Sequence, residues 1–564
     1  MNNKQKLLIV SDFNADNLSA YLNADQDTQG VDARTAPFGQ PAQVLLDGSM
    51  ACWEDVRLAV VWTRPEGVID GFRRLSQGEP IFQSEILDQV DQWCVILQSA
   101  AERVNAIFVP LWTIPAWDRG LGFIDLKHEQ GIAAALMKMN ARLLDNLAKV
   151  PNAYPLDATR WLRSGGESAA AAKLWYLGKI PFANPVFMEA AKEIKAASQS
   201  LLGAGRKLVI LDLDDTLWGG IIGDDGIDGV KLGGHDPVGE AFFDFQTALR
   251  TLLRRGILLA IVSKNEESVA LHAIENHPEM VLKKENFAAW RINWNDKAAN
   301  VIEVVEELNL GLQSVVFIDD NPAERDRVRE ALPEVFVPDW PKDKTQYTTT
   351  LKSLSCFDQP TLSGEDAARS KLYAVERERR SSQASVASVD DWLKTLNVKV
   401  TCEVVNDQNM QRTIQLLNKT NQMNLTTRRL TEQELRDWLA DERRQLWTMR
   451  ISDKFGDLGL TGICSMQVQG DEAQVVDFIL SCRVMGRKIE EAMLAILQQN
   501  AQRRGVTKLV AQYLPTQKNN PCLTFFQKAM APCPSDENRF VFDLLEPSTF
   551  PECVTVADGA ENHE

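Results

Sequence analysis

The chain has 564 residues, of which 45% are hydrophobic and 25% are charged, and its formal net charge is −17. At about 150 residues for each domain, this length predicts roughly three or four domains of ordinary globular composition. The negative charge argues against nucleic acid and anionic membranes as partners, because the sequence contains no convincing basic patch. With no signal peptide and no apolar run near the roughly 18 residues that cross a membrane, we expect a cytoplasmic protein.

Residues 1–196 alternate short aliphatic strands with longer helical stretches. The strands include "KLLIV", "VRLAVVW" and "AIFVPLW", and one helical stretch is "ILDQVDQWCVILQSAAERV". Alternating strands and helices are typical of a parallel sheet that is covered on both faces. The nine cysteines of the chain are scattered and form no C-x-x-C pair, which argues against a disulfide framework or a zinc site.

Residues 197–345 repeat this alternation with strands that are almost continuously apolar. Such strands are typical of a parallel sheet that is buried on both faces. Three of them run directly into polar clusters, at "KLVILDLDDT", "GILLAIVSKN" and "QSVVFIDDN". Because ligands of open parallel sheets bind beyond the carboxyl ends of the strands, these clusters predict a functional site at one edge of the sheet.

The first cluster contains three acidic residues, Asp212, Asp214 and Asp215. Phosphate monoesters hydrolyse extremely slowly, so an enzyme gains by dividing the reaction through an aspartyl-phosphate intermediate. We predict that Asp212 is the nucleophile. Asp214 is predicted to protonate the leaving oxygen and then to deprotonate the attacking water. Asp215 has no chemical task in this scheme and is predicted to be a turn or cap residue.

The other clusters supply groups that stabilise a phosphate. Ser263 is predicted to donate a hydrogen bond to a phosphoryl oxygen, and Lys297 to neutralise developing charge from a helix that Asn295 caps. Carboxylates are hard ligands suited to Mg²⁺. We predict that a magnesium site is formed by Asp212, Asp214, Asp319 and Asp320.

The set of D-x-D-x-T, a serine after the next strand, a lysine and a terminal acidic pair resembles the haloacid dehalogenase (HAD) superfamily. A calcium-binding loop is the alternative for the first motif, but Thr216 lies at its fifth ligand position and no glycine follows at the sixth. Only short loops separate the first strand from its helix, so we expect a HAD-like Rossmannoid parallel sheet without a large cap domain. An open site of this kind can admit a macromolecular or carrier-borne substrate.

A narrower resemblance, to the FkbH-like subfamily, extends over most of the chain. It is carried by the segments "DLDDTLWGGIIGDDG", "SKNEES", "HPEM", "NWNDKAANV", "FIDDNPAERDRVRE", "DKFGDLGLTG", "SCRVMGRKIEEAML" and "YLPTQKNN". The resemblance implies an enzyme of polyketide-type biosynthesis that takes 1,3-bisphosphoglycerate, removes phosphate and loads a glyceryl group on an acyl carrier protein through an enzyme thioester. The family has a cysteine directly before the serine of "SKN", where this chain has Val262.

Residues 396–550 resemble a GNAT (acetyltransferase-like) α+β fold, because three strands precede a helix and a further strand. In that fold the helix after the central strand presents backbone N–H groups to a pyrophosphate. Arg483, Gly486 and Arg487 stand at the corresponding place, whereas Lys488 replaces the small residue of the family pattern. The resemblance implies that this loop binds a phosphopantetheine arm, as on a carrier protein or CoA. The alternative is that Gly486 only lets the helix and the strand approach each other.

Two segments flank this region, and one cysteine in it is a candidate for the acylated thiol. Residues 346–395 are polar and serine-rich and are predicted to form a linker, and residues 551–564 are predicted to be a flexible acidic tail. Cys482 lies at a strand end and a helix N-terminus beside Arg483, where a thiolate would be stabilised. The alternative is that Cys482 is a small buried residue.

The N-terminal part resembles the SGNH-hydrolase-like module with a flavodoxin-type sheet that often precedes these two domains. Its nucleophile block should read Gly-Asp-Ser, whereas the first strand here is followed by Ser11 and Asp12. At the expected Asp-x-x-His motif, Asp157 is followed by Arg160 in place of the histidine, and His128 lies elsewhere in "DLKHEQ". These departures imply a scaffold or docking role rather than hydrolysis.

Three functions remain open from the sequence. The first is the FkbH-like reaction with a phosphorylated three-carbon acid and a carrier protein. The second is glyceryl transfer to a sugar or amine, or a plain Mg²⁺-dependent phosphatase, which Val262 keeps open. The third is a non-catalytic assembly protein, against which the intact set of motif residues argues.

Overall fold

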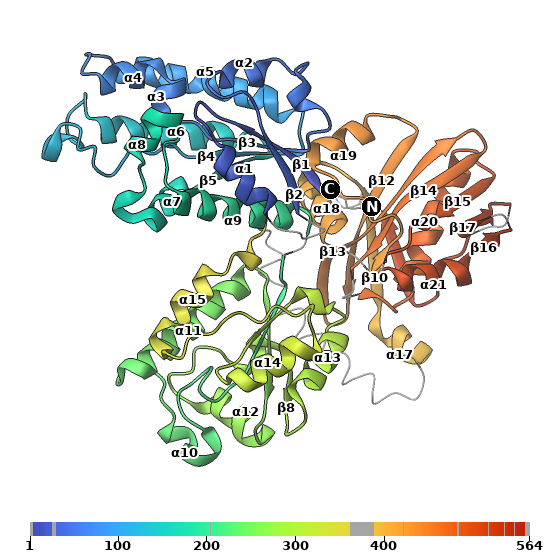
Figure 1. Ribbon diagram of the computed structural model, residues 1–564. Helices are drawn as coiled ribbons and strands as arrows, with labels where there is room; N and C mark the ends of the chain where they lie inside the picture. Colours follow the sequence, from blue (N-terminus) through green and yellow to red (C-terminus); the bar gives the residue numbers. More distant parts are fainter. Residues whose placement is uncertain are drawn as a thin grey trace. The chain divides into compact units, whose positions relative to one another are not determined.

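The chain is seen in a computed structural model as a mixed α/β protein with two parallel sheets and one mixed sheet (Figure 1). The structure describes residues 4–24, 30–203, 205–360, 389–420, 422–481, 484–516, 518–534, 536–545 and 548–558. The chain divides into two compact units, which are Met1–Gln199 with Leu430–Trp438 and Ser200–Arg429 with Leu439–Glu564. Among the helices of the described ranges, none is both long and apolar enough to cross a bilayer.

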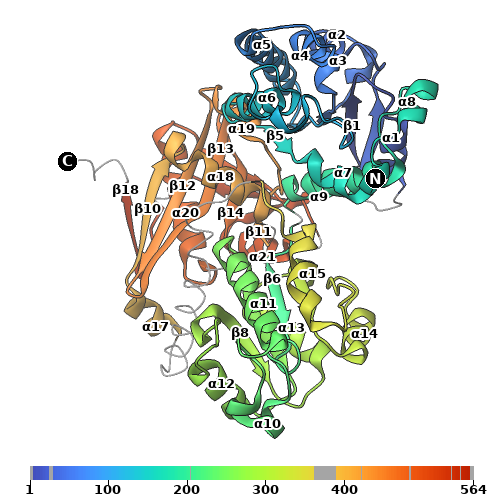
Figure 2. The ribbon, with the colours of Figure 1, turned by 90° about the vertical axis from the view of Figure 1, so that its left-hand side faces the viewer.

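The first unit contains a five-stranded parallel sheet in the order β2-β1-β3-β4-β5, which is a flavodoxin-type order. Its strands are β1 (Gln5–Val10), β2 (Val31–Thr35), β3 (Leu58–Val61), β4 (Ala106–Pro110) and β5 (Ala153–Leu156). Its helices are α1 (Asp16–Asn23), α2 (Pro41–Leu46), α3 (Pro65–Val68), α4 (Asp70–Ser76), α5 (Gln83–Ala101), α6 (Ile132–Leu147), α7 (Ala158–Gly165), α8 (Ala172–Gly178), α9 (Asn184–Leu201) and α19 (Glu432–Leu439). Val61 and Val109 share a buried core with Val90 and Leu97 of α5, and α7 and α9 lie on the other side of the sheet (Figure 2). The predicted parallel sheet with two covered faces is confirmed.

The second unit contains a four-stranded parallel sheet in the order β8-β7-β6-β9. The strands are β6 (Leu208–Leu211), β7 (Leu258–Ser263), β8 (Phe287–Ile292) and β9 (Val315–Ile318). The helices around it are α10 (Ile222–Gly229), α11 (Pro237–Arg254), α12 (Glu267–Asn276), α13 (Lys297–Glu307), α14 (Pro322–Ala331) and α15 (Tyr347–Ser353). Val209 and Leu211 share a core with α11, whereas Leu208 and Ile210 share the opposite core with α13. Residues 212–236 join β6 to α11 and contain one short helix, α10.

Both ends of the predicted linker are folded. Tyr347 and Leu351 of α15, together with Phe357, are buried in the same core as α11, so this part of the chain extends well beyond the predicted boundary at residue 345. At the other end, α17 (Val389–Leu396) contributes the buried Trp392 to the core of the mixed sheet. The prediction began the linker too early because a few widely spaced apolar residues in a polar stretch are a weak signal. Residues 361–388 lie outside the described residues.

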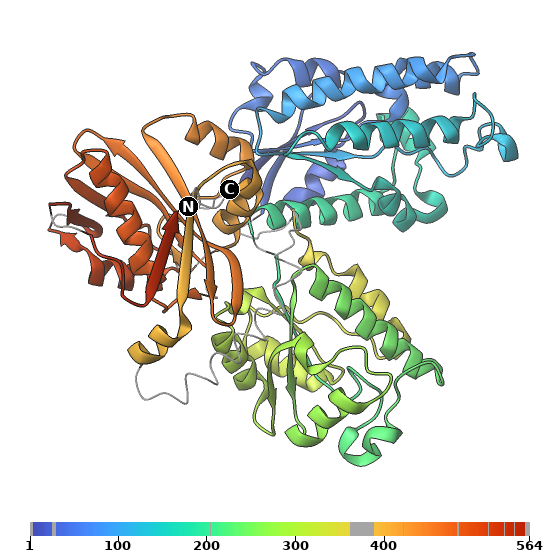
Figure 3. The ribbon, with the colours of Figure 1, turned by 180° about the vertical axis from the view of Figure 1, so that it is seen from behind.

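The mixed sheet has the order β16-β17-β15-β14-β13-β12-β10-β18, with β11 also paired to β14. Its strands are β10 (Val398–Val404), β11 (Met423–Asn424), β12 (Arg444–Asp453), β13 (Gly456–Gln469), β14 (Glu472–Leu480), β15 (Lys508–Gln512), β16 (Ala531–Cys533), β17 (Asp536–Asp543) and β18 (Val554–Asp558). Its helices include α18 (Asp407–Lys419), α20 (Ile489–Arg503) and α21 (Asn520–Ala529). Figure 3 shows this sheet, in orange and red, from behind.

The predicted acidic tail is partly a strand. Val554 pairs with Val398, and β18 runs parallel to β10 at the edge of the mixed sheet. The prediction of a flexible segment from residue 551 is therefore wrong for residues 554–558, because "VTVAD" is long enough to add to an edge strand through backbone hydrogen bonds. Residues 559–564 lie outside the described residues.

Candidate active site at the carboxyl edge of the four-stranded sheet

Strands β6 and β9 bring three carboxylates together. Leu211 pairs with Ile318, so Asp212 and Asp319 follow at the ends of adjacent strands. The N–H of Asp212 also donates to the carbonyl of Ile318 at 3.0 Å. Carboxylate oxygens of Asp212, Asp319 and Asp320 lie within 4.8 Å of one another, and the first two residues are buried. The structure therefore groups three of the four predicted metal ligands.

Lys297, the first residue of α13, lies between two of these carboxylates. Its Nζ is 2.9 Å from Asp212 Oδ2 and 2.6 Å from Asp319 Oδ2, and only 4% of its side chain is exposed. Burial lowers the pKa of Lys297, but the two carboxylates outweigh burial and raise it to about 12. The lysine is therefore charged at neutral pH.

The N-terminus of α13 is capped by a different residue from the one predicted. The carboxylate of Asp296 accepts a hydrogen bond from the N–H of Ala299 at 3.2 Å, so Asp296 is the N-cap. The N–H of Asn295 donates instead to Asn293 Oδ1 at 3.0 Å. The prediction of Asn295 as the cap is wrong because α13 starts at Lys297, which leaves the neighbouring aspartate in the cap position.

One oxygen of the acidic cluster lacks a hydrogen bond. Asp212 Oδ1 is buried and has no partner among the residues that the structure describes. Burial, followed by repulsion from Asp212, raises the pKa of Asp319 in spite of the nearby lysine. Hard carboxylate oxygens at this spacing are ligands that a divalent cation of the Mg²⁺ type prefers. The donor set therefore fits such a cation, which would satisfy the unpaired oxygen and offset the negative charge.

The fourth predicted ligand, Asp214, is not among the three carboxylates that are grouped within 4.8 Å. Its Oδ1 accepts hydrogen bonds from Trp218 Nε1 at 2.9 Å and from the N–H of Ile222 at 3.0 Å. Its Oδ2 accepts one from Asn265 Nδ2 at 2.8 Å. Three donors thus fix the position of this side chain. Burial, with a smaller contribution from the Asp212 charge, raises the pKa of Asp214, whereas these hydrogen bonds lower it.

The site also contains Ser263 and Thr216 at buried positions. Ser263 ends β7, two residues beyond Ile261, which pairs with Leu211. It therefore lies at the same sheet edge as the acidic cluster. Thr216 Oγ1 accepts a hydrogen bond from the N–H of Asp320 at 3.1 Å. The threonine of the D-x-D-x-T motif thus ties the first motif to the last.

Two residues that the sequence did not single out support the turn after Asp212. Asp215 adopts a left-handed φ of 51°, which confirms its predicted place in a turn. Its carbonyl accepts hydrogen bonds from Lys344 Nζ at 2.8 Å and from Tyr347 Oη at 3.1 Å. Sequence reasoning missed both residues because they lie in the polar stretch "PKDKTQYTTT".

The predicted phosphopantetheine loop is described only in part, since Cys482 and Arg483 lie outside the described residues. The N–H of Gly486 donates to Glu490 Oε1 at 2.9 Å. Arg487 lies 3.3 Å from Asp453 Oδ2, and the side chains of this pair are 4% and 0% exposed. The two described candidate residues, Gly486 and Arg487, thus both contact carboxylates of the protein. Their role toward a ligand stays a prediction.

The candidate residues of the first unit are each engaged locally. The Ser11 hydroxyl donates to the carbonyl two residues further on. The Asp12 side chain is only 5% exposed and accepts hydrogen bonds from the N–H and Nε of Arg64 at 2.7 and 2.9 Å. Asp157 caps α7, and His128 Nδ1 accepts from a nearby backbone N–H at 3.0 Å. The predicted scaffold role of this unit stays a prediction.

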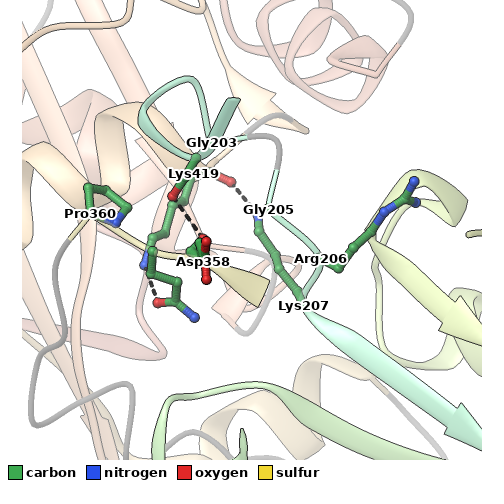
Figure 4. Close-up of a pocket in the computed structure, with 9 residues that line it drawn as sticks. Gly203, Gly205, Arg206, Lys207, Asp358, Pro360 and Lys419 are labelled. Atoms are coloured by element: carbon green, nitrogen blue, oxygen red, sulfur yellow. Dashed lines mark hydrogen bonds between the residues drawn. The ribbon is translucent and has the colours of Figure 1, made fainter. Parts of the chain in front are cut away.

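A small cavity lies at the opposite end of β6 from the acidic cluster (Figure 4). It is lined by residues before β6, after α15 and at the end of α18, among them Lys207, Asp358 and Lys419. Lys207 Nζ donates to the carbonyl of Lys419 at 2.7 Å. Because Lys207 precedes the strand and Asp212 follows it, this cavity is separate from the candidate active site.

Comparison with known proteins gives a likeness to solved structures. No family model and no curated protein matches the chain. The N-terminal part of the protein BF1531 from Bacteroides fragilis, which contains a phosphatase domain complexed with Mg, is 24% identical, and the match covers 64% of this chain and 95% of that chain with a TM-score of 0.57. At this level of identity the match shows that the two proteins share a fold.

Acetyltransferases match a shorter part of the chain. The ribosomal-protein-S18-alanine N-acetyltransferase from Escherichia coli is 13% identical over 27% of this chain and 97% of its own, with a TM-score of 0.19. A GNAT-family acetyltransferase from Staphylococcus aureus is 11% identical over 26% of this chain and 99% of its own, with a TM-score of 0.21. These scores are too low to support an argument about function.

Proposed function

We propose that the chain is a Mg²⁺-dependent phosphohydrolase of the HAD type that forms an aspartyl-phosphate on Asp212. The observation that carries this proposal is the acidic cluster itself. Oxygens of Asp212, Asp319 and Asp320 lie within 4.8 Å, Lys297 contacts two of the three acids, and Asp212 Oδ1 lacks a hydrogen bond within the described residues. A buried carboxylate next to a site that can hold a cation is the arrangement that nucleophilic attack on a phosphate group needs.

The metal ligands in this proposal are Asp212, Asp319 and Asp320. Bound Mg²⁺ would polarise the phosphoryl group and would reduce the repulsion between the Asp212 carboxylate and the negatively charged phosphate. Support also comes from the shared fold with the BF1531 fragment, whose phosphatase domain is complexed with Mg. Asp214 is left out of the ligand set because it is not among the grouped carboxylates and both of its oxygens already accept hydrogen bonds.

The proposed reaction has two steps, which are formation and hydrolysis of the aspartyl-phosphate. In the first, an Asp212 oxygen bonds to phosphorus, the bond from phosphorus to the leaving oxygen breaks, and Asp214 gives that oxygen a proton. In the second, water bonds to phosphorus, Asp214 takes the proton, and the bond between phosphorus and Asp212 breaks. The raised pKa of Asp214 suits this exchange of a proton. Lys297 and Ser263 stabilise the charge on the phosphoryl oxygens.

We further propose the FkbH-like reaction, in which the substrate is 1,3-bisphosphoglycerate and the glyceryl group passes to an acyl carrier protein. The sequence resemblance and the strand β14 followed by the helix α20 support it. Transfer to a sugar or amine, or plain phosphatase activity, is the alternative. Val262 favours the alternative, because it is fully buried and leaves no thiol beside Ser263.

Phosphate release from acetyl phosphate and p-nitrophenyl phosphate, with Mg²⁺ or with a chelator, tests the first proposal. The unsubstituted chain should release phosphate only with the metal, and Asp212→Asn should release none. Asp224→Asn is the matched control, because Asp224 is an exposed acid on α10. Equal release by the Asp212→Asn and unsubstituted chains would instead favour a non-catalytic assembly protein.

Intact-mass analysis of a carrier protein after incubation with 1,3-bisphosphoglycerate tests the second proposal. A gain of one glyceryl group on the phosphopantetheine arm is expected. Phosphate release without that gain would support the alternative, and a panel of sugar and amine acceptors would then separate transfer from plain hydrolysis.

A further inference from the structure

A second lysine contacts the acidic cluster from outside the four motifs. Lys344 belongs to a short 3₁₀ helix, Lys344–Gln346, that follows the sheet in sequence. Its Nζ lies 3.5 Å from Asp320 Oδ2 and 3.6 Å from Asp215 Oδ1, in addition to its hydrogen bond with the Asp215 carbonyl. The ammonium group therefore touches one predicted metal ligand directly and the nucleophile loop as well.

The position of Lys344 is fixed by the core of the protein. Tyr347, three residues on, is 1% exposed and makes ring contacts with Phe242, Phe245 and Trp340. Its hydroxyl donates to the same Asp215 carbonyl that Lys344 binds. Two donors from one packed segment thus converge on one oxygen. Because the side chain of Lys344 is only 23% exposed, its ion pair with Asp320 is better shielded than one on an open surface.

The charges around Lys344 predict how this residue affects the binding of a cation and of a phosphate group. Lys297 contacts Asp212 and Asp319, whereas Lys344 contacts Asp320, so each of the three clustered carboxylates has a lysine partner. A cation bound by these carboxylates would be repelled by the Lys344 ammonium, while a phosphate dianion would be attracted to it. Lys344 therefore acts in opposite directions on the two ligands that the proposed reaction needs.

We propose that Lys344 is a positioning residue that weakens Mg²⁺ binding at the acidic cluster and strengthens binding of the phosphate group there. It holds the Asp215 turn in place and supplies a positive charge beside Asp320. This inference rests on the proposed phosphohydrolase function. A lysine with a purely structural role would support both ligands, so its loss would weaken both.

Lys344→Gln tests the inference, because glutamine keeps an N–H donor for the Asp215 carbonyl and removes the charge. Calorimetry on the full chain would measure the Kd of Mg²⁺ alone and, at saturating Mg²⁺, the Kd of inorganic phosphate. We expect the glutamine variant to bind Mg²⁺ roughly ten-fold more tightly and phosphate roughly ten-fold more weakly. Lys344→Arg, which keeps the charge, should lie within about two-fold of the unsubstituted chain for both ligands.

The outcomes separate this inference from the proposed function. Weaker binding of both ligands to Lys344→Gln, or no change in either, would overturn the role of Lys344 and leave the phosphohydrolase proposal intact. Failure of the unsubstituted chain to bind Mg²⁺ would overturn both. If the glutamine variant does not fold by circular dichroism, Lys344→Met gives the same charge test with the same expected opposite shifts.

Discussion

Replacing Lys297 by methionine should destabilise the four-stranded sheet when no metal is bound. The substitution leaves the buried carboxylates of Asp212 and Asp319 without their shared cation. The rise in the pKa of Lys297 from 10.5 to about 12 corresponds to about 2 kcal/mol of stabilisation of the charged lysine. Because two buried carboxylates also lose their partner, we expect a total loss of about 3–5 kcal/mol.

The effect should depend on pH in a defined direction. The folded pKa of Lys297 lies above its unfolded value, so its contribution is fully present below pH 10.5 and is lost as the pH rises through about 12. At the acidic end, burial and Asp212 raise the pKa of Asp319 to about 6. Because Lys297 lowers the pKa of Asp319, its removal raises that pKa further and the variant takes up the proton first. The difference from the unsubstituted chain should therefore shrink as the pH falls toward about 6, where the unsubstituted chain takes up the proton as well.

Hydrogen exchange with mass spectrometry suits this measurement, because a chain with several cores is not expected to unfold in a single step. Peptides that cover β6 and β9, compared at neutral pH in a chelator, would give the local opening free energies. Lys264→Met is the matched control, because it removes a lysine that also forms an ion pair, with Glu324 at 2.6 Å, but whose side chain is 38% exposed. That control should cost about 1 kcal/mol or less. Equal exchange in the two variants would refute the assignment of a buried charge network.

Three further predictions concern the same site. Asp214→Asn should slow hydrolysis of phosphate monoesters about 10²–10⁴-fold but acetyl phosphate much less, because a carboxylate leaving group needs little protonation; an equal loss for both substrates in steady-state assays would contradict the acid role. Asn265→Ala removes a donor to Asp214 and should raise the pKa of Asp214, moving the alkaline limb of the pH–rate profile upward; a downward movement would show that Asp214 is not that acid. Mg²⁺ at 100 times its Kd should raise the opening free energy of the β6 and β9 peptides, measured by hydrogen exchange, by about 2.7 kcal/mol. Exchange rates that do not change when Mg²⁺ is added would argue against a metal site there.

The core of the site was predictable because its residues follow buried strands. Asp212, Ser263 and Asp319 each come at or directly after the end of a continuous apolar strand, and parallel pairing of β6 with β7 and β9 brings such positions to one edge. Lys297 was predictable from its motif and its place at a helix start. These signals are local in sequence, and the pairing of neighbouring strands converts them into contacts.

The remaining features depend on contacts between distant side chains. Nothing in the spacing of Asp214 shows that Trp218 and Asn265 would donate hydrogen bonds to its carboxylate. Lys344 reaches Asp215 across 129 positions of sequence, from a stretch whose polar composition is that of a linker. The buried Tyr347 that anchors it gives only one apolar position, which is too weak a pattern to mark a helix.

The helix α19 determines when the first unit can be completed during synthesis. That unit consists of Met1–Gln199 and Leu430–Trp438, so its last segment is made only after residues 200–429. At the usual translation rate of about 5–20 residues per second, roughly 10–50 seconds pass between the synthesis of the five-stranded sheet and the synthesis of that segment. The second unit begins to emerge during this interval. A fragment that stops at residue 199 would therefore represent an intermediate of synthesis rather than the finished unit.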